Sequence, residues 1–385
     1  MINDEQLDTL RDFSKFAPRF LNIRTKSGEP KLFAFNRAQR YLHERLETQL
    51  RETGRVRAVV LKGRQQGCST LIEARFFHKV ISGRGKKAFI LTHDKEATKN
   101  LFGMAQRFCE NLDDGLIPKP DTSNAKELYF RDFDSGYAVG TAGNKSVGRS
   151  QTIQLLHASE VAYWAFAEEH AKGILQAVSN EPGTEILMES TANGIGNYFH
   201  QRWLTAMQED NEYQAIFLPW YWQDEYKYSA ENFNMSDEEE HLYGLYGSNG
   251  LTTEHLSWRR LKINEFSKDY EAGREHFNVE YPLNATEAFK NPVNNIFINS
   301  KYVEKARKGD IDQKGNLIIG VDVAISDRDR TAIIRRKGRC SYNLERFQNY
   351  NTMEIVGRLK RIIHEERPHR MYIDCIGIGA GVVDR

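Results

Sequence analysis

Short apolar runs alternate with longer amphipathic segments through most of the chain. The apolar run 56–61 is followed by a glycine-containing loop and by a segment, 71–80, with helical spacing. The run 87–92 has the pattern of a second buried strand, and Asp94 is placed to cap the helix after it. Further strands are predicted at 127–130, 137–141, 152–157, 185–189 and 215–219. Strands that alternate with helices predict an α/β fold with a mainly parallel sheet covered by helices.

Helical patterns flank this α/β region on both sides. The segment before residue 55 is amphipathic and predicts a helix. After the strands, Ser236 and Glu239 have the spacing of a capping box, and a second helix is expected to begin at Thr252 or Thr253 and to run towards Gly273.

The pattern weakens between residues 291 and 316 and then resumes. Strands are predicted at 317–323, 331–335, 340–347 and 370–375, with a helix over 352–366 before the last of them. We therefore expect two domains, 1–300 and 301–385. Because the chain stops at Arg385, where another helix should begin, the second domain is expected to be incomplete.

Composition narrows the class of protein. The chain has 385 residues, with 54 Lys and Arg against 53 Asp and Glu, which excludes a strongly polybasic coat and leaves local patches for any contact with nucleic acid. No apolar run approaches the roughly 18–20 residues of a membrane span, and the acidic amino terminus is unlike a signal peptide. The four cysteines lie far apart and indicate neither disulfides nor a zinc site. A cytoplasmic protein is expected.

The loop after the first strand has the context of a phosphate-binding loop, between a strand and a helix. Its backbone amides and the helix amino terminus favour phosphate. It departs twice from G-x-x-x-x-G-K-[ST]: Lys62 stands at the first glycine and Cys68 at the lysine. Because phosphoryl transfer needs a cation on the phosphates, we expect Lys62 to supply it, with Arg64 as a second candidate. Ser69 is expected to bind Mg²⁺, with Thr70 as the fallback. The nucleotide-binding residues predicted here are Lys62, Gly63, Arg64, Gln65, Gln66, Gly67, Cys68, Ser69 and Thr70. A glycine-rich turn that binds no nucleotide is the alternative.

The strand 152–157 runs into Ser159 and Glu160. A strand that ends on an acid fits the partner motif of a phosphate loop, and Glu160 is the candidate general base or water-orienting residue. Ser159, at the position of the first acid, is a weaker electrostatic partner. A solvated capping glutamate is the alternative for Glu160.

Two further features accompany this acid. The segment 189–194 follows a strand, and its small polar residues are candidates to sense the γ-phosphate and relay hydrolysis; a capped turn is the alternative. Arg149, in a glycine-rich loop, is a candidate arginine finger for the charge of the transition state, and a surface arginine is the alternative.

A second set of carboxylates ends strands of the second domain. Asp322 closes the strand 317–323, and Asp374 closes a later strand. Acids at the ends of adjacent strands can converge on two Mg²⁺ or Mn²⁺ ions, the arrangement for phosphodiester hydrolysis. Asp327 and Asp329, in the loop after the first strand, are additional candidates. Strand-end caps are the alternative.

In this order the motifs resemble the large subunit of tailed-phage terminases, a DNA-packaging ATPase followed by an RNase H-like nuclease, over nearly the whole chain. The segment 36–39 is similar to the family's adenine-contacting segment, which makes Gln39 the candidate adenine contact. Residues 62–70 are similar to a deviant Walker A loop, 159–164 to a Walker B variant and 190–194 to the coupling motif.

The remaining motifs follow the same order. Residues 280–282 and 287–289 resemble the close of the family's ATPase domain. Arg149 lies where some terminases carry an arginine finger that acts on a neighbouring subunit. Residues 320–322 and 373–384 resemble the first two acidic motifs of the nuclease. The family carries a third acidic motif further towards the carboxyl end, and this chain stops before it.

The resemblance implies a P-loop ATPase domain followed by a partial RNase H-like domain. It implies ATP-driven translocation of double-stranded DNA into a procapsid and metal-dependent endonuclease cutting of concatemeric DNA by the parent protein. Implied cofactors are ATP and Mg²⁺, with Mg²⁺ or Mn²⁺ at the nuclease site. Implied partners are double-stranded DNA, the portal protein, the small terminase subunit and further copies in a ring. A helicase-like ATPase and a non-catalytic assembly fragment that docks on the portal or small subunit are the alternatives.

Overall fold

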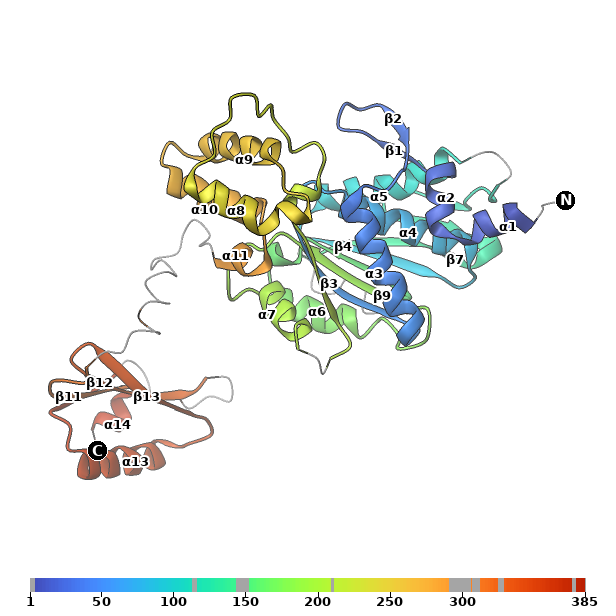
Figure 1. Cartoon of the computed structure of the whole chain (residues 1–385). Coiled ribbons are helices and arrows are strands. Elements are labelled where there is room, and N and C mark those ends of the chain that lie inside the picture. Colours follow the sequence, from blue (N-terminus) through green and yellow to red (C-terminus); the bar gives the residue numbers. More distant parts are fainter. Residues whose placement is uncertain are drawn as a thin grey trace. The chain divides into compact units, whose positions relative to one another are not determined.

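The computed structural model describes residues 4–112, 116–142, 152–208, 211–290, 306, 312–324, 329–375 and 379–384 (Figure 1). The chain divides into two compact units, residues 1–300 and 301–385. None of the helices within these described ranges is both long and apolar enough to cross a lipid bilayer.

An eight-stranded sheet forms the centre of the first unit. Its spatial order is β10 (Gln214–Leu218), β3 (Val56–Lys62), β9 (Glu185–Ser190), β8 (Leu155–Ser159), β4 (Lys87–Thr92), β7 (Ser135–Thr141), β6 (Glu127–Phe130) and β5 (Thr122–Ser123). Each pair of neighbouring strands from β10 to β7 is parallel. Strand β6 pairs antiparallel with β7, and β5 pairs antiparallel with β6. The predicted α/β class with a mainly parallel sheet is confirmed. The order also places β9 between β3 and β8.

Helices cover both faces of this sheet (Figure 1). The covering helices are α3 (Arg37–Thr53), α4 (Cys68–Ser82) and α5 (Lys95–Glu110) on one face, and α6 (Ala167–Leu175) and α7 (Tyr198–Ala206) on the other. Both faces of the sheet are apolar and have to be covered, as strand β3 shows. Ala58 and Val60 pack into the apolar cluster of the first face, whereas Val59 and Leu61 pack into the cluster of the second face. A strand buried on both faces has a continuous apolar run instead of alternation, as 56–61 has.

The amino-terminal segment packs against α4. It consists of α1 (Asp4–Arg11), α2 (Phe13–Phe20) and a hairpin of β1 (Asn22–Arg24) and β2 (Pro30–Leu32). The Phe16 ring lies 4.8 Å from the ring of His78, and His78 Nε2 is 2.8 Å from the carbonyl oxygen of Leu10. The helix predicted before residue 55 corresponds to α3, which ends where Gly54 adopts a left-handed conformation.

Two boundaries differ from the sequence prediction. Strand β8 begins at Leu155 and not at residue 152, because Ile153 makes only an isolated bridge to Val178. The helix expected to run towards Gly273 is two helices, α9 (Thr253–Phe266) and α10 (Tyr270–Glu280). They pack so closely that a Cβ atom on Gly273 would lie 2.3 Å from the carbonyl oxygen of Ile263.

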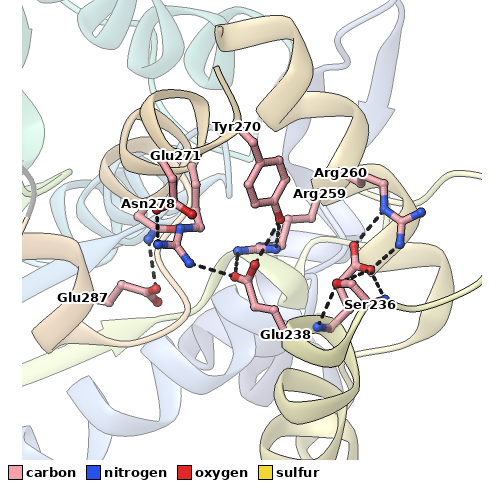
Figure 2. A network of polar contacts seen from close by, with 10 residues as sticks. Ser236, Glu238, Arg259, Arg260, Tyr270, Glu271, Asn278 and Glu287 are labelled. Carbon is pink, nitrogen blue, oxygen red and sulfur yellow. Dashed lines mark hydrogen bonds and ion pairs between the residues drawn. The ribbon is translucent and has the colours of Figure 1, made fainter. Parts of the chain in front are cut away.

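A helical region follows the sheet: α8 (Asp237–Tyr246), α9, α10 and α11 (Ala285–Lys290). Figure 2 shows the polar network that joins these helices. Glu238 accepts hydrogen bonds from Arg259 at 2.7 Å and from the hydroxyl of Tyr270 at 3.1 Å. Asn278 donates to Glu287 at 2.9 Å, which ties α10 to α11. These contacts fix α10, whose last residue, Glu280, reaches the loop after β3.

Short 3-10 helices complete the first unit: η1 (Arg131–Phe133), η2 (Val161–Tyr163), η3 (Trp220–Trp222) and η4 (Gly247–Asn249). Helix η2 directly follows the end of β8, and η3 follows β10. Both therefore lie close to the carboxyl edge of the parallel sheet.

The second unit has a four-stranded sheet in the order β13 (Cys340–Phe347), β12 (Thr331–Lys337), β11 (Leu317–Asp322) and β14 (Arg370–Ile373). Only β11 and β14 pair in parallel among these neighbours. Helix α13 (Thr352–Glu366) packs Ile355 and Leu359 into the same cluster as Ile319 and Ile333, and the short α14 (Ala380–Val383) adds Val382. The prediction of a second, smaller sheet with its own helices is confirmed.

Candidate active site

The loop between β3 and α4 has the backbone that an anion site requires. Gly67 caps α4 with φ of 75° and provides no side-chain hydrogen bond to the first turn of the helix. The first amides of an α-helix have no carbonyl partner within the helix, and such amides bind anions. A Cβ atom on Gly67 would lie 2.5 Å from Gln39 Nε2, so both the conformation and the space demand glycine. Gln65 in the same loop also has positive φ, 52°.

Side chains and neighbouring segments hold the loop in this shape. The amide of Gly63 donates to Gln66 Oε1 at 2.7 Å, and Gln66 Nε2 donates to the carbonyl oxygen of Pro219 at 2.7 Å. The amide of Arg64 donates to the carbonyl oxygen of Glu280 at 2.8 Å. Both polar atoms of the Gln66 side chain are therefore hydrogen-bonded within the protein. The predicted contact of Gln66 with nucleotide stays a prediction and would have to come from its backbone.

Gln39, the candidate adenine contact, lies against the loop. Its Oε1 accepts the amide of Asn36 at 2.9 Å, and its Nε2 donates to the carbonyl oxygen of Gly67 at 2.8 Å. Both ends of the amide are thus engaged in capping α3 and positioning Gly67. The adenine contact stays a prediction.

Lys62 lies at the front of the loop and faces two carboxylates. Its ammonium is 2.8 Å from Glu160 Oε1 and 3.1 Å from Glu189 Oε2. Burial by itself lowers the pKa of Lys62, but the charges of Glu160 and Glu189 outweigh it and raise that pKa. Burial raises the pKa of the Cys68 thiol, so this residue is neutral at pH 7 and contributes no charge at the usual lysine position. Lys62 is consequently a cation held inside the site.

Glu160 is held in a strained conformation at the end of β8. Its backbone is left-handed, with φ of 51° and ψ of 47°, which is unusual for a residue with a side chain and common at functional sites. Its Oε2 accepts a hydrogen bond from Ser190 Oγ at 3.3 Å. The Glu160 side chain is 27% exposed whereas that of Glu189 is 0% exposed, so of these two acids Glu160 is the one that solvent water reaches.

Glu189 begins the segment 189–194 noted in the sequence, but no role of its own was predicted for its carboxylate. Ser69 Oγ donates to Glu189 Oε1 at 2.8 Å and Ser159 Oγ donates to the same atom at 2.7 Å. Burial raises the pKa of Glu189, but Lys62 and the hydrogen bonds from His157 and Ser159 outweigh it and hold that pKa well below its ordinary value. The available signal was the one used for Asp322, an acid at the end of a buried strand.

A histidine and a second acid stand behind Glu189. His157 Nε2 is 3.3 Å from Glu189 Oε1, and His157 Nδ1 is 2.5 Å from Oε1 of Glu73 in α4. All three side chains are fully buried. Burial by itself lowers the pKa of His157, but the hydrogen bonds to Glu189 and Glu73 overcome it and raise the pKa to about 9. The contacts with Glu189 and Glu73 therefore favour the protonated form of His157.

The segment 190–194 is joined to the end of β8. The amide of Ala162 donates to Ser190 Oγ at 3.2 Å, and Asn193 Nδ2 donates to the carbonyl oxygen of Ala162 at 3.0 Å. The hydroxyl of Tyr163 lies 3.0 Å from Thr191 Oγ1. Polar contacts therefore join this segment to the end of β8, and its predicted role in relaying hydrolysis stays a prediction.

The donors gathered here suit Mg²⁺, a hard cation that takes oxygen ligands and usually keeps several waters. Ser69 gives its hydroxyl proton to Glu189, which leaves the lone pairs of Ser69 Oγ for a metal. Thr70 Oγ1 instead faces Met104 Sδ at 3.9 Å, so Ser69 fits better than Thr70. Within the described ranges, no three His, Cys, Asp or Glu side chains form a self-sufficient metal site.

Two candidates from the sequence cannot be placed. Arg149 and Asp327 lie outside the residues that the structure describes. The arginine finger therefore stays a prediction.

The two acids of the second unit come together at one edge of its sheet. Because β11 and β14 run parallel, their carboxyl ends meet, and the amide of Asp374 donates to the carbonyl oxygen of Val321 at 2.9 Å. Asp322 and Asp374 line a hollow of about 430 Å³ together with Ala332, Leu344 and Tyr372. The adjacency predicted from the sequence is present, and its role in binding metal stays a prediction.

Comparison with known proteins supports the fold. No protein-family model matches this chain, and no curated protein sequence does. The chain is similar to the large terminase of bacteriophage HK97, with a TM-score of 0.55 and 13% identity over 94% of this chain and 73% of that one. The ATPase domain of the large terminase of Thermus phage P74-26 matches with a TM-score of 0.43 and 13% identity, over 73% of this chain and 97% of that one. The large terminase of a thermophilic bacteriophage, in complex with ADP, matches with a TM-score of 0.41 and 9% identity, over 88% of this chain and 76% of that one. At these identities the similarity to HK97 establishes a shared fold, and the predicted resemblance to large terminases is confirmed at that level.

Proposed function

We propose that this chain, which shares its fold with a phage large terminase, is the ATP-hydrolysing motor subunit of a machine that moves double-stranded DNA into a procapsid. One observation carries the proposal: the amino terminus of α4, the buried cation of Lys62 and the water-accessible Glu160 meet at one edge of a parallel sheet, and Gly67 adds no side-chain cap to the helix. A helix amino terminus and a cation bind phosphates, and a carboxylate beside them orients water.

Each residue has a distinct task in the proposed reaction. The loop amides and Lys62 hold the triphosphate, and Ser69 holds Mg²⁺, which neutralises charge on the phosphate oxygens. In the arrangement described, Lys62 neutralises Glu160 at 2.8 Å. A phosphate oxygen that competes for the ammonium frees the Glu160 carboxylate to orient the attacking water. Arg149 from a neighbouring subunit would stabilise the charge of the transition state.

The remaining partners follow from the proposed packaging role. DNA would be held mainly through its phosphates by local basic patches, since the chain is nearly neutral, and binding would weaken steeply with salt. The portal protein, the small terminase subunit and further copies of this chain in a ring would complete the machine. The unit 301–385 would contribute Asp322 and Asp374 to the metal site of an RNase H-like nuclease that cuts concatemeric DNA in the parent protein.

The first test is nucleotide binding by a Lys62→Ala variant. Without the ammonium, the triphosphate loses a charge-assisted contact worth about 1.5–3 kcal/mol, so we expect affinity for a non-hydrolysable ATP analogue to fall roughly 10–100-fold. Fluorescence titration with the analogue, together with DNA-stimulated ATP hydrolysis, measures the effect. Lys79→Ala is the matched control, because Lys79 pairs with Glu185 at 3.0 Å near the other end of α4.

The outcomes separate the proposal from its alternatives. Equal affinity in wild type and Lys62→Ala would remove Lys62 from the site. A wild-type chain that binds portal or small subunit but hydrolyses nothing would favour the assembly fragment. ATP hydrolysis coupled to strand separation, without packaging, would favour a helicase-like ATPase.

The second unit is tested separately by Mn²⁺ binding. Two carboxylates at one sheet edge are expected to hold Mn²⁺, and Asp322→Asn is expected to weaken that binding at least roughly 10-fold, as loss of a charged ligand does. Electron paramagnetic resonance of free Mn²⁺ provides the measurement, with plasmid cleavage followed in parallel. Asp312→Asn is the control, because exposed Asp312 pairs with Lys314 away from the hollow. Equal Mn²⁺ binding in wild type and Asp322→Asn would contradict the metal site.

A further inference from the structure

We propose that Glu189, from strand β9, organises the Mg²⁺ of the nucleotide through Ser69, in the place that an acid at the Ser159 position of β8 would otherwise occupy. This deepens the proposed function and rests on it. Glu189 is a positioning residue in this role, because it acts on the metal through the Ser69 hydroxyl.

The order of the strands allows an acid on β9 to take the role of an acid on β8. Strand β9 lies between the loop strand β3 and the acidic strand β8. In the register, Glu189 is beside Val60 of β3 on one side and Ser159 of β8 on the other. A long acidic side chain from the middle strand therefore reaches both the loop and the end of β8, and a serine on β8 suffices to contact it.

The hydrogen bonds to Glu189 show how this acid would make Ser69 a better ligand for the metal. Ser69 and Ser159 both donate to Glu189 Oε1, at 2.8 and 2.7 Å. A hydroxyl that donates to a carboxylate becomes a better electron donor, and its lone pairs stay available for a cation. Glu189 Oε2 is buried, accepts no hydrogen bond from the described residues and contacts the Lys62 ammonium at 3.1 Å. Glu189 is therefore placed to orient Ser69 and, through Lys62, the cation on the phosphates.

The other groups at this edge do not fill the same role. Glu160 is bound to Lys62 and Ser190, and no contact between Glu160 and Ser69 is present among the described residues. Ser159 is uncharged and donates its proton to Glu189. His157 contacts Glu189 Oε1 at 3.3 Å and is itself held by Glu73 in α4, so these two groups hold the carboxylate of Glu189 in place. Glu189 is thus the acid in direct contact with the predicted metal ligand.

The test measures how strongly Mg²⁺ supports nucleotide binding to the full chain. Affinity for a fluorescent non-hydrolysable ATP analogue is titrated at Mg²⁺ concentrations from zero to saturation. For Glu189→Gln we expect the Mg²⁺ concentration needed for half-maximal support to rise roughly 10–100-fold, the range seen when a partner behind a metal ligand is lost. The thermal midpoint without nucleotide, measured beside it, separates this effect from damage to the fold.

Two further variants keep the test decisive. Glu189→Asp retains the charge but shortens its reach to Ser69, so it is expected to fold and still to require more Mg²⁺; it carries the test if Glu189→Gln does not fold. The exchange variant Ser159→Asp with Glu189→Ser returns the acid to β8 and is expected to recover Mg²⁺ dependence relative to Glu189→Ser alone. Glu185→Gln is the matched control, a buried acid on the same strand that pairs with Arg75 and Lys79.

Three results overturn the inference. Mg²⁺ dependence that is unchanged in Glu189→Gln and Glu189→Asp would make Glu189 purely structural. An equal change in Glu185→Gln would show a general effect of losing a buried acid. An exchange variant no better than Glu189→Ser would show that the acid's position on β9 is not interchangeable with β8. Failure of the wild-type chain to bind nucleotide at any Mg²⁺ concentration would instead refute the proposed function itself.

Discussion

Glutamine in place of Glu160 is expected to lower ATP turnover by roughly 10²–10⁴-fold while nucleotide binding is retained. The substitution keeps the size and the left-handed backbone position of Glu160 but removes the charge that orients the attacking water. It also removes the carboxylate that is 2.8 Å from the ammonium of Lys62, so the cation is freer to meet the triphosphate. Affinity for a non-hydrolysable analogue should therefore be equal to that of the wild type or higher.

Single-turnover hydrolysis and analogue binding, measured on the same preparations, check this expectation. Glu168→Gln is the matched control, because Glu168 is an exposed acid in the first turn of α6. Turnover in Glu160→Gln within a few-fold of wild type would exclude Glu160 as the base. Loss of analogue binding along with turnover would assign it to binding the nucleotide.

The largest effect on stability is expected from Arg75→Met. Arg75 is buried in α4, donates from two nitrogens to Glu185 at 2.8 Å and also pairs with Glu47. Methionine has a similar volume but leaves Glu185, which is fully buried, with Lys79 as its remaining ion-pair partner among the residues that the structure describes. Breaking a buried ion pair from one side costs about 3–5 kcal/mol, so the free energy of unfolding at pH 7 is expected to fall by that amount. Urea denaturation followed by circular dichroism measures it.

Acid should reduce this penalty, and the direction follows from Glu185. Burial raises the pKa of Glu185, but Arg75 and Lys79 outweigh it and lower the pKa to about 2. In the wild type this contribution to stability is full above pH 4.5 and is lost as pH falls from 4.5 to about 2. Without Arg75 the pKa of Glu185 should rise, because burial is then opposed mainly by Lys79, so the variant loses less stability than the wild type as pH falls.

The difference in unfolding free energy between Arg75→Met and wild type should therefore be smaller at pH 4 than at pH 7. Arg131→Met is the control, because Arg131 is 78% exposed and its 3.4 Å contact with Asp121 is a surface ion pair, worth about 0–1 kcal/mol. A penalty for Arg75→Met that is no larger than that of Arg131→Met would show that the buried pair adds no stability.

Local pattern was sufficient for the fold class and for most strands. Apolar runs predicted β3 and β4 because a strand buried on both faces has to be apolar at consecutive positions. The strands of the second sheet were also predicted, although β12 alternates in burial and β13 and β14 are only partly buried. It failed at Thr152, where the pattern continues but the backbone pairs only later, and at Ser267, where two helices meet instead of one. In the first case Ile153 bridges to the distant Val178. In the second case the break is local, because Asp269 caps a new helix three residues after α9 ends.

Four features could be predicted from the sequence alone: the α/β class, the glycine loop, the unusual position of Lys62 and the acid that follows β8. Each can be recognised from a short stretch of neighbouring residues. Only the tertiary structure decided which strand lies between β3 and β8. That order brings Glu189 to Ser69 and Lys62. Parallel strands are joined through helices, so packing between the layers, and not adjacency in the chain, sets the spatial order of the strands. That spatial order decides which side chains at the strand ends meet.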